Sequence, residues 1–231
     1  MIYVTGDLHG EIDVGKLDDF NIPDLTKDDM LIICGDFGFV WDYRGPSGYE
    51  KRWLDYLEQK PYTILFVDGN HENFNRLNKE FPIVKWHGGN VHKLREHVIH
   101  LMRGQLYLLE GKVFFTMGGA SSHDKILRQP QKSWWPQELP NSGEMYTGRR
   151  NLEIVNRKVD YIITHCLPTS LQRKVPKFGY DTNRLTDYLD EIYKNVDFSH
   201  WYCGHYHMNY KINDKVEILY QRIKKIDGII D

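Results

Sequence analysis

Five short apolar runs, each followed by a polar residue after a glycine or directly, constrain the fold of this chain most. The first run is Ile2-Tyr3-Val4, which ends at Thr5-Gly6 and is followed by Asp7 and His9. The other four runs deliver Asp36, the pair Asn70 and His71, His165, and the pair His205 and His207. Uninterrupted apolar runs of this length are typical of strands buried on both faces. Carboxylates and imidazoles at the carboxyl ends of such strands indicate an active site on an α/β sheet.

Length and composition indicate one large domain. The 231 residues suffice for a sizeable core, and a hydrophobic content of 41% with 13% aromatics excludes a disordered chain. The net charge of −2 gives no global signal for nucleic acid or for an anionic membrane. No apolar run approaches the roughly 18 residues that a membrane span needs, and the first strand leaves no room for a signal peptide. We expect a soluble, cytoplasmic protein, and the sequence leaves its oligomeric state open.

The three cysteines, Cys34, Cys166 and Cys203, form no CxxC pair and are odd in number. This pattern argues against a disulfide framework and fits a reducing compartment. We expect each cysteine to be a small buried residue at a strand end.

The first third of the chain predicts a β-α-β-α-β unit with parallel strands. We expect strands at 2–7, 30–34 and 62–67, with helices at 14–20 and 49–59 between them. The remaining expected elements are a short helix at 73–80, a loop near 86–90, strands at 98–102, 105–109 and 112–120 with a hairpin turn at Glu110-Gly111, a helix at 146–159, a strand at 160–164, a helix at 181–195, and two or three strands within 201–226.

Residues 121–145 form a long irregular segment with three prolines. A segment of this length inside a compact domain is typical of a functional lid, and its two tryptophans favour that interpretation. Trp134 and Trp135 could stack on a nucleobase or could pack on their own domain. The sequence leaves that alternative open.

Mixed carboxylate, amide and imidazole ligands without thiolate suit divalent ions such as Mn, Fe, Zn or Ni. The candidate ligands are Asp7, His9, Asp36, Asn70, His165, His205 and His207. Seven ligands are too many for one tetrahedral site. They are about right for two cations that share one bridging carboxylate, an arrangement used for displacement at phosphorus.

The motifs GDLHG, Gly35-Asp36, GNHE, a lone histidine after a strand, and GHYH occur in this order. In that order they resemble the calcineurin-like metallophosphoesterase superfamily, and they extend over nearly the whole chain. The resemblance implies an α/β (α+β) fold, a four-layer αββα sandwich of two mixed β-sheets flanked by helices. We expect one such domain over residues 1–231, with a lid or insert at about 121–145.

The same resemblance implies roles for the candidate residues. Asp7, His9 and His207 would hold one metal, Asn70, His165 and His205 the other, and Asp36 would bridge the two. His71 is similar to the family's histidine that protonates the leaving oxygen or stabilises the phosphoryl charge. Mn is the expected metal, with Fe, Zn or Ni as alternatives.

GDLHG and GNHE are most similar to the serine/threonine phosphoprotein phosphatases and the symmetrical diadenosine tetraphosphatases. In those enzymes an aspartate orients the catalytic histidine, but Phe39 takes its place here, and Asp42 is a candidate replacement. Their phosphate-binding arginine before GNHE is also missing, because this chain has Val67-Asp68. The candidate substrate contacts that could replace it are Arg44 in the second-motif loop and His123, Lys125 and Arg128 in the insert.

The sequence therefore predicts a metal-dependent phosphoric ester hydrolase. It would hydrolyse a phosphomonoester or pyrophosphate bond by attack of a metal-bridging hydroxide on a phosphorylated small molecule, nucleotide or phosphoprotein. A phosphodiesterase or nuclease of the same fold is the alternative, to which GHYH also points. A non-catalytic scaffold is a third reading, and the presence of His71 argues against it.

Overall fold

The computed structural model describes residues 1–176 and 182–226, and within them the strands form two mixed sheets. The seven-stranded sheet has the order β13-β1-β2-β3-β6-β5-β4. Its strands are β1 (Ile2–Thr5), β2 (Met30–Ile33), β3 (Thr63–Phe66), β4 (Ile83–Trp86), β5 (Gly89–Lys93), β6 (Val98–Leu101) and β13 (Lys224–Lys225). The six-stranded sheet has the order β11-β12-β10-β9-β8-β7. Its strands are β7 (Gln105–Leu109), β8 (Lys112–Met117), β9 (Lys158–Thr164), β10 (Asp197–Cys203), β11 (Tyr210–Lys211) and β12 (Val216–Ile218).

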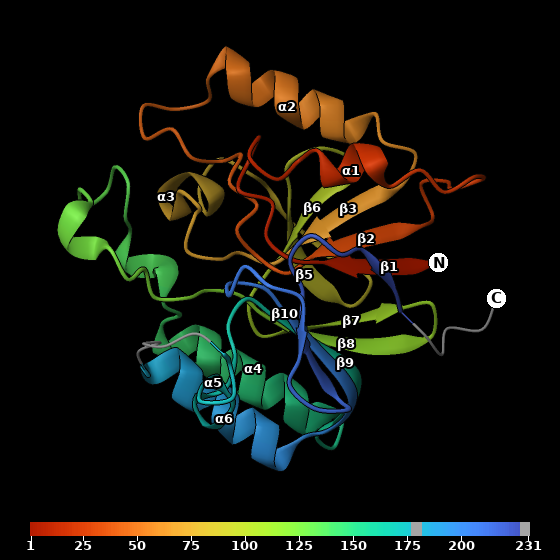
Figure 1. Cartoon of the computed structure of the whole chain (residues 1–231), viewed down its shortest axis with the longest axis vertical. Helices are drawn as coiled ribbons and strands as arrows, with labels where there is room; N and C mark the ends of the chain where they lie inside the picture. The colour runs from red at the N-terminus through yellow and green to blue at the C-terminus, as the bar shows by residue number, and fades with distance from the viewer. Residues whose placement is uncertain (177–181, 227–231) are drawn as a thin grey trace.

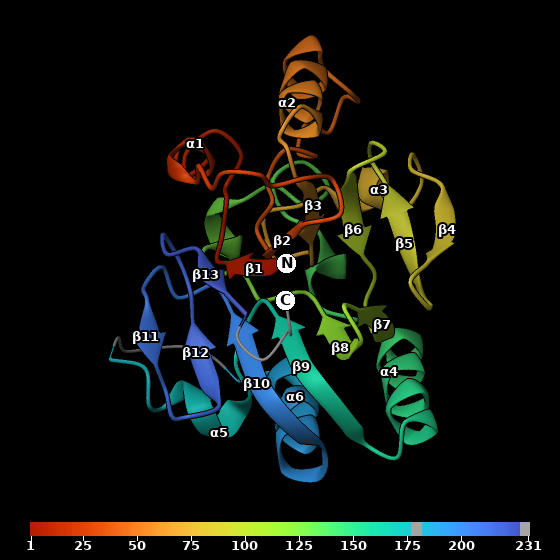
Figure 2. The same cartoon turned by 90° about the vertical axis from the view of Figure 1, so that its right-hand side faces the viewer.

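Helices cover the outer face of each sheet (Figure 1). The seven-stranded sheet carries α1 (Lys16–Asp19), α2 (Gly48–Glu58) and α3 (Phe74–Leu77), and the six-stranded sheet carries α4 (Ser142–Ile154), α5 (Thr169–Gln172) and α6 (Arg184–Asn195). Figure 2 shows the two sheets facing each other between α2 on one side and α4 and α6 on the other. The predicted four-layer αββα sandwich is confirmed.

The apolar runs of the sequence are explained by three core layers. Side chains alternate along a strand, so neighbours in a run enter different layers. Val4 and Ile32 pack between the two sheets, whereas Leu31 packs under α1 and α2. In the other sheet Ile163 enters the central layer and Ile162 the layer beneath α4 and α6. Because both faces of each strand are buried, the runs show no polar alternation.

Parallel pairing aligns the strand ends that carry the polar residues. β1, β2, β3 and β6 are parallel neighbours in one sheet, and β8, β9, β10 and β12 in the other. The predicted parallel β-α-β-α-β unit is therefore confirmed. Because the strands are in register, the loops after β1, β2 and β3 leave the same edge of the sheet.

The expected loop at 86–90 is wrong, because β4 and β5 form a hairpin there. His87 and Gly88 make its tight turn with φ angles of 46° and 95°. This is the left-handed backbone that a two-residue hairpin requires, and a histidine in place of Asn or Asp hides the turn from the sequence pattern. The predicted hairpin at Glu110-Gly111 is confirmed, with the same backbone conformation.

Other predicted boundaries shift by a few residues. Helix α4 begins at Ser142 instead of 146, because Asn141 and Glu144 form a capping box. The insert expected at 121–145 therefore overlaps the first turn of this helix. β9 begins at Lys158 instead of 160, and the C-terminal part holds four strands from β10 to β13 where two or three were expected. The predicted start of the helix at Asp181 lies outside the described residues, and α6 is described from Arg184.

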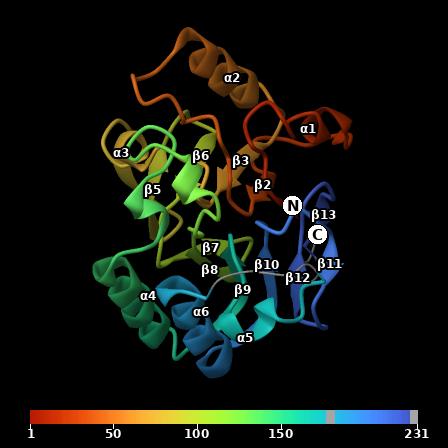
Figure 3. The ribbon, with the colours of Figure 1, turned by 60° about the vertical axis from the view of Figure 1, so that its left-hand side comes forward.

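The insert, residues 121–141, contains two short 3₁₀ helices, η1 (Lys125–Leu127) and η2 (Pro136–Glu138). The buried carboxylate of Glu138 accepts hydrogen bonds from the Ser122 backbone and hydroxyl and pairs with Lys125 at 2.5 Å. Asn75 of α3 donates to Gln131 at 2.5 Å and accepts from Gln137 at 3.1 Å. In Figure 3 the insert lies in green in front of the sheets beside α3. These contacts hold the irregular chain in one conformation.

Cys34, Cys166 and Cys203 are free and buried, as expected. In the part of the chain that the structure describes, no helix combines the length and apolar character needed to cross a membrane.

A buried ion pair joins α2 to α3 and predicts a stability effect. Arg76 donates to Glu50 at 2.6 and 2.7 Å with both side chains about 95% buried, and it also contacts the more exposed Glu80. Glu50→Ala should lower the free energy of unfolding by about 2–3 kcal/mol, because it leaves a buried guanidinium partly unpaired. In urea titrations the control Glu191→Ala, which removes the exposed partner of Arg149, should cost less than about 1 kcal/mol. Equal losses in the two variants would contradict this interpretation.

Candidate active site

The loops that follow β1, β2 and β10 hold their polar residues in an unusual backbone conformation. His9, Asp36, His205 and His207 have φ angles of 46°, 48°, 70° and 48°. Residues other than glycine rarely adopt this left-handed region, and such strained conformations gather at functional sites. Here the strained conformation occurs at four polar residues that follow three strands.

Three of these side chains, His9, Asp36 and His207, meet the side chain of Asp7. Ligand atoms of Asp7, His9, Asp36 and His207 all lie within 4.8 Å of one another. The Nε2 atom of His9 is 3.2 Å from Asp36 Oδ2, and Nε2 of His207 is 3.2 Å from Asp7 Oδ2. This is the set that the resemblance assigned to the first metal together with the bridging aspartate.

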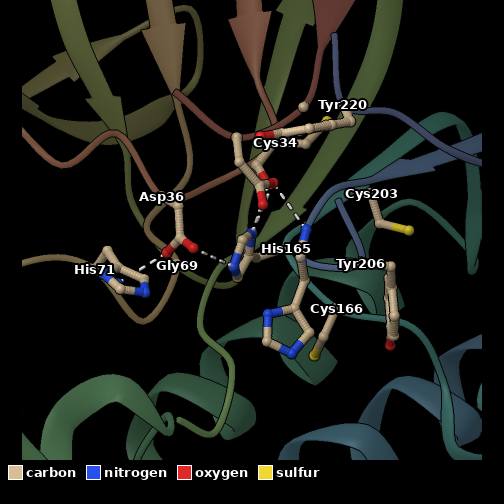
Figure 4. Close-up of polar contacts among 12 residues, drawn as sticks. Cys34, Asp36, Gly69, His71, His165, Cys166, Cys203, Tyr206 and Tyr220 are labelled. Atoms are coloured by element: carbon tan, nitrogen blue, oxygen red, sulfur yellow. Dashed lines mark hydrogen bonds and ion pairs between the residues drawn. The ribbon is translucent and has the colours of Figure 1, made fainter. Parts of the chain in front are cut away.

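Asp36 also contacts residues expected at the second metal, and Figure 4 shows its carboxylate between the rings of His71 and His165. Its Oδ1 accepts from the backbone N–H groups of Asn70 at 2.7 Å and His71 at 2.8 Å. Its Oδ2 lies 3.3 Å from Nε2 of His165. Nδ1 of His165 donates to the Cys34 carbonyl oxygen at 2.7 Å, so Nε2 is the ring nitrogen that faces Asp36.

His205 belongs to the same group. Its backbone N–H donates to Asp7 Oδ1 at 2.8 Å, and its ring lies 4.9 Å from the ring of His165. Burial and the neighbouring charge of His165 lower the pKa of His205 to about 3. A neutral imidazole is the form that binds a metal.

Glycines before these residues leave room for ligands from other strands. A Cβ atom on Gly69 would collide with the carboxylate of Asp36, and one on Gly204 with the carboxylate of Asp7. Gly69 of GNHE and Gly204 of GHYH are therefore required for the same steric reason. Each lets a loop of one strand approach an aspartate that follows another strand.

The two buried aspartates stay ionised because positive charge surrounds them. Burial raises the pKa of Asp36, but the charges of His165 and His9 outweigh it and hold the pKa well below the usual range. Burial lowers the pKa of His165, but Asp36 and Asp7 raise it to about 10. In the same way, the two aspartates outweigh burial and raise the pKa of His9 to about 9. Two ionised carboxylates buried this close together need positive charge beside them.

Unsatisfied buried atoms test whether metal ions fit the site. No hydrogen bond in the described residues satisfies Asp7 Oδ2, Asn70 Oδ1 or His165 Nε2, although all three atoms are buried. Nε2 of His207 lies 3.2 Å from Asp7 Oδ2, and Asp36 Oδ2 lies 3.3 Å from Nε2 of His165, but neither pair is aligned as a hydrogen bond. Buried polar atoms without partners are rare in native proteins. A carboxylate oxygen, an amide oxygen and an imidazole nitrogen are all metal ligands, so divalent cations fit.

Two residues that sequence reasoning missed support the ligands. Asp13 Oδ2 lies 2.7 Å from Nδ1 of His9 and thereby turns Nε2 toward the cluster, while Asp13 Oδ1 accepts from Tyr220. Glu72 accepts from the N–H groups of Phe37 at 2.6 Å and Gly69 at 2.7 Å. Burial and the neighbouring Asp36 and Asp68 raise the pKa of Glu72 to about 8. The i, i+4 spacing of His9 and Asp13 and the last letter of GNHE were the available signals.

His71 lies between His9 of the cluster and Arg128 of the insert. Its ring is 5.2 Å from the ring of His9, and its Nε2 is 3.4 Å from Nη2 of Arg128 in the insert. Burial lowers the pKa of His71, Arg128 and His9 lower it further, and Asp36 opposes them. The ring of Trp41 stacks on His71 with centroids 5.7 Å apart.

The four candidate substrate contacts occupy different places. Arg128 is at His71, and the ring of His123 stacks on His205 at 5.7 Å. Lys125 is held by Glu138 and Ser121 inside the insert. Arg44 pairs with Asp42, and 74% of its side chain is exposed. Asp42 therefore pairs with Arg44, and within the described residues its carboxylate makes no hydrogen bond to the ring of His71.

The model of the calcineurin-like phosphoesterase family matches residues 1–209. Among solved structures, a phosphopantetheinyl hydrolase from Mycobacterium tuberculosis is 17% identical, with 95% of this chain and 87% of that chain covered and a TM-score of 0.49. A likeness this slight carries no argument about activity. No curated protein matches. Because the family model spans most of the chain and includes every strand-end motif described above, the chain belongs to the calcineurin-like phosphoesterase family.

Proposed function

We propose that this chain is a dinuclear-metal phosphoester hydrolase that acts on a phosphomonoester or pyrophosphate bond. The observation that carries the proposal is the set of buried, unsatisfied atoms on Asp7, Asn70 and His165 around the carboxylate of Asp36. Asp7, His9 and His207 would hold one cation, Asn70, His165 and His205 the other, and Asp36 would touch both. Mn is the expected ion, and Fe, Zn and Ni suit the same ligands.

Two divalent cations held there would supply Lewis acidity toward the phosphoryl oxygens and a water acidic enough to attack near neutral pH. The chain would supply the remaining steps. His71 would give a proton to the leaving oxygen as the P–O bond breaks. An anionic phosphate beside its ring would raise the lowered pKa of His71 and favour the protonated form.

The insert supports a monoester or terminal phosphate as substrate. The guanidinium of Arg128 lies beside the ring of His71. Only 14% of the Arg128 side chain is exposed, so little solvent screens its charge. A partly buried guanidinium pairs best with a dianionic phosphate that offers two free oxygens. We assign Arg128 at His71 and His123 at His205 the phosphate contact that the missing arginine before GNHE would make. All three cations have a carboxylate partner: Lys125 pairs with Glu138 and Arg44 with Asp42. Arg128 pairs with Asp124 through Nε at 2.7 Å, and its Nη2 lies 3.4 Å from Nε2 of His71.

Hydrolysis of p-nitrophenyl phosphate and of bis-p-nitrophenyl phosphate in the presence of Mn tests the reaction class. A monoesterase should prefer the first substrate, and a phosphodiesterase or nuclease should prefer the second. Inactivity on both substrates with metals bound would overturn the proposal in favour of a non-catalytic scaffold.

Metal binding should stabilise the fold, because the ligand residues come from both sheets. Adding Mn to metal-free protein should raise the unfolding midpoint by several degrees, on the order of 5 °C at a hundredfold excess over Kd. Asp36→Asn should abolish most of this rise in differential scanning fluorimetry. The matched variant Asp214→Asn, at a fully exposed position, should keep it. A full rise in Asp36→Asn would contradict the bridging assignment.

His71→Ala should lower kcat by roughly 10² or more, the usual size of a general-acid contribution. The metal content, measured by atomic emission, should stay at the wild-type value because His71 contributes no ligand atom. An equal loss of metal and activity would mean that His71 serves metal binding and not proton transfer.

Arg128→Met should raise KM for a phosphomonoester by about tenfold, since a charge-assisted hydrogen bond to phosphate is lost. Steady-state kinetics on Arg157→Met, which removes an exposed arginine paired with Glu153, provide the control. If both variants had the wild-type KM, Arg128 would not contact the substrate.

A further inference from the structure

His71 lacks the partner that usually orients a catalytic imidazole. Phe39 stands where the related phosphatases have an aspartate, and Asp42 is bound to Arg44. Among residues 1–176 and 182–226, no carboxylate is hydrogen-bonded to the ring of His71. Its backbone N–H is fixed by Asp36, but a fixed backbone does not by itself set the rotation of the ring about its side-chain bonds.

Trp41 supplies a flat surface for that ring. The two rings are 5.7 Å apart at 26° to each other, a stacked arrangement. Trp41 is partly exposed, whereas its edge-on neighbour Trp135 is 99% buried, with ring centroids 5.2 Å apart at 77°. Trp135 belongs to the insert, whose Glu138 hub is buried. The indole that faces His71 therefore packs against a buried side chain of the insert.

The stacking is built into the backbone as well. The side chain of Asn73 donates to the Trp41 carbonyl oxygen at 3.3 Å, and the Asn73 N–H donates to the Val40 carbonyl oxygen at 2.8 Å. Asn73 is two residues from His71, so the loop of the indole and the loop of the imidazole are joined beside their contact. A surface tryptophan that met His71 by chance would not need these bonds.

We propose that Trp41, supported by Trp135, is a positioning residue that orients the ring of His71 by stacking, in place of a hydrogen-bonded carboxylate. The inference deepens the proposed function and rests on it for the role of His71. A ring face restricts the tilt of the imidazole while leaving both nitrogens available. One nitrogen can then face Arg128 and the phosphate, and the proton can pass to the leaving oxygen.

The dependence of kcat on the leaving group separates positioning from a structural role. Phenolate is a basic leaving group that needs a proton as the P–O bond breaks, whereas 2,4-dinitrophenolate leaves without one. Trp41→Ala should therefore lower kcat on phenyl phosphate about tenfold and on 2,4-dinitrophenyl phosphate less than about threefold, with KM unchanged. Trp41→Phe, which keeps a stacking ring, should restore kcat on phenyl phosphate to within about twofold.

Trp53→Ala is the matched control, because Trp53 is a half-buried tryptophan of α2 that packs on Phe39 and Tyr56. It should leave the ratio of the two kcat values unchanged. An equal loss on both substrates in Trp41→Ala, or no rescue by Trp41→Phe, would overturn the proposal.

A second measurement does not need activity. In metal-free protein the ring protons of His71, assigned through their loss in His71→Gln, should give one NMR signal set shifted by the Trp41 ring current. Trp41→Ala should shift and broaden that set, and Trp41→Phe should keep it narrow. Unchanged signals in Trp41→Ala would overturn the proposal. If the wild type hydrolyses no phosphoester while the signals change as expected, the proposed function fails and the orientation by Trp41 stands.

Discussion

Two buried carboxylates at the meeting point of two sheets dominate this structure. Asp7 and Asp36 lie where water is excluded, and each remains ionised only because donors and positive charge surround it. Backbone N–H groups from the loops after β3 and β10 supply part of this stabilisation. An isolated buried carboxylate would cost far more than one domain can sustain, so the rest of the site is arranged around these two.

That constraint explains the conformation of the loops. The left-handed backbone at His9, His205 and His207 keeps these residues beside the two aspartates. Gly69 and Gly204 lack side chains because the carboxylates occupy the space that a Cβ would need. Glu72 then ties the loops after β2 and β3 together from behind. The strained backbone, the two glycines and the surrounding positive charge are therefore all arranged around the carboxylates of Asp7 and Asp36.

The sequence indicated the buried strands and the candidate ligands because each leaves a local pattern, whereas the layered sandwich was implied by the resemblance of the ordered motifs to the family. Buried strands give uninterrupted apolar runs, and a glycine next to a polar residue marks the end of most of them. The β4–β5 hairpin was missed because His87 occupies a turn position that usually holds Asn or Asp. Asp42 was a reasonable replacement for the missing aspartate by sequence position, yet its loop turns it toward Arg44. The contact of Trp41 with His71 joins loops thirty residues apart and leaves no local signal.

The insert adds its own side chains to the cluster of carboxylates and imidazoles at the strand ends. Glu138 organises an irregular segment that brings Arg128 to His71 and His123 to His205. Specificity in this chain would then come from the insert, while the metal chemistry would come from the strand ends.

Strand ends from both sheets would hold two cations with Asp36 between them. Anomalous diffraction from a crystal of the full chain soaked with Mn would locate these ions. We expect two peaks a few ångströms apart, one beside His9 and one beside His165, with the Asp36 carboxylate touching both. A single peak at either place, or two peaks of which Asp36 touches only one, would contradict this arrangement.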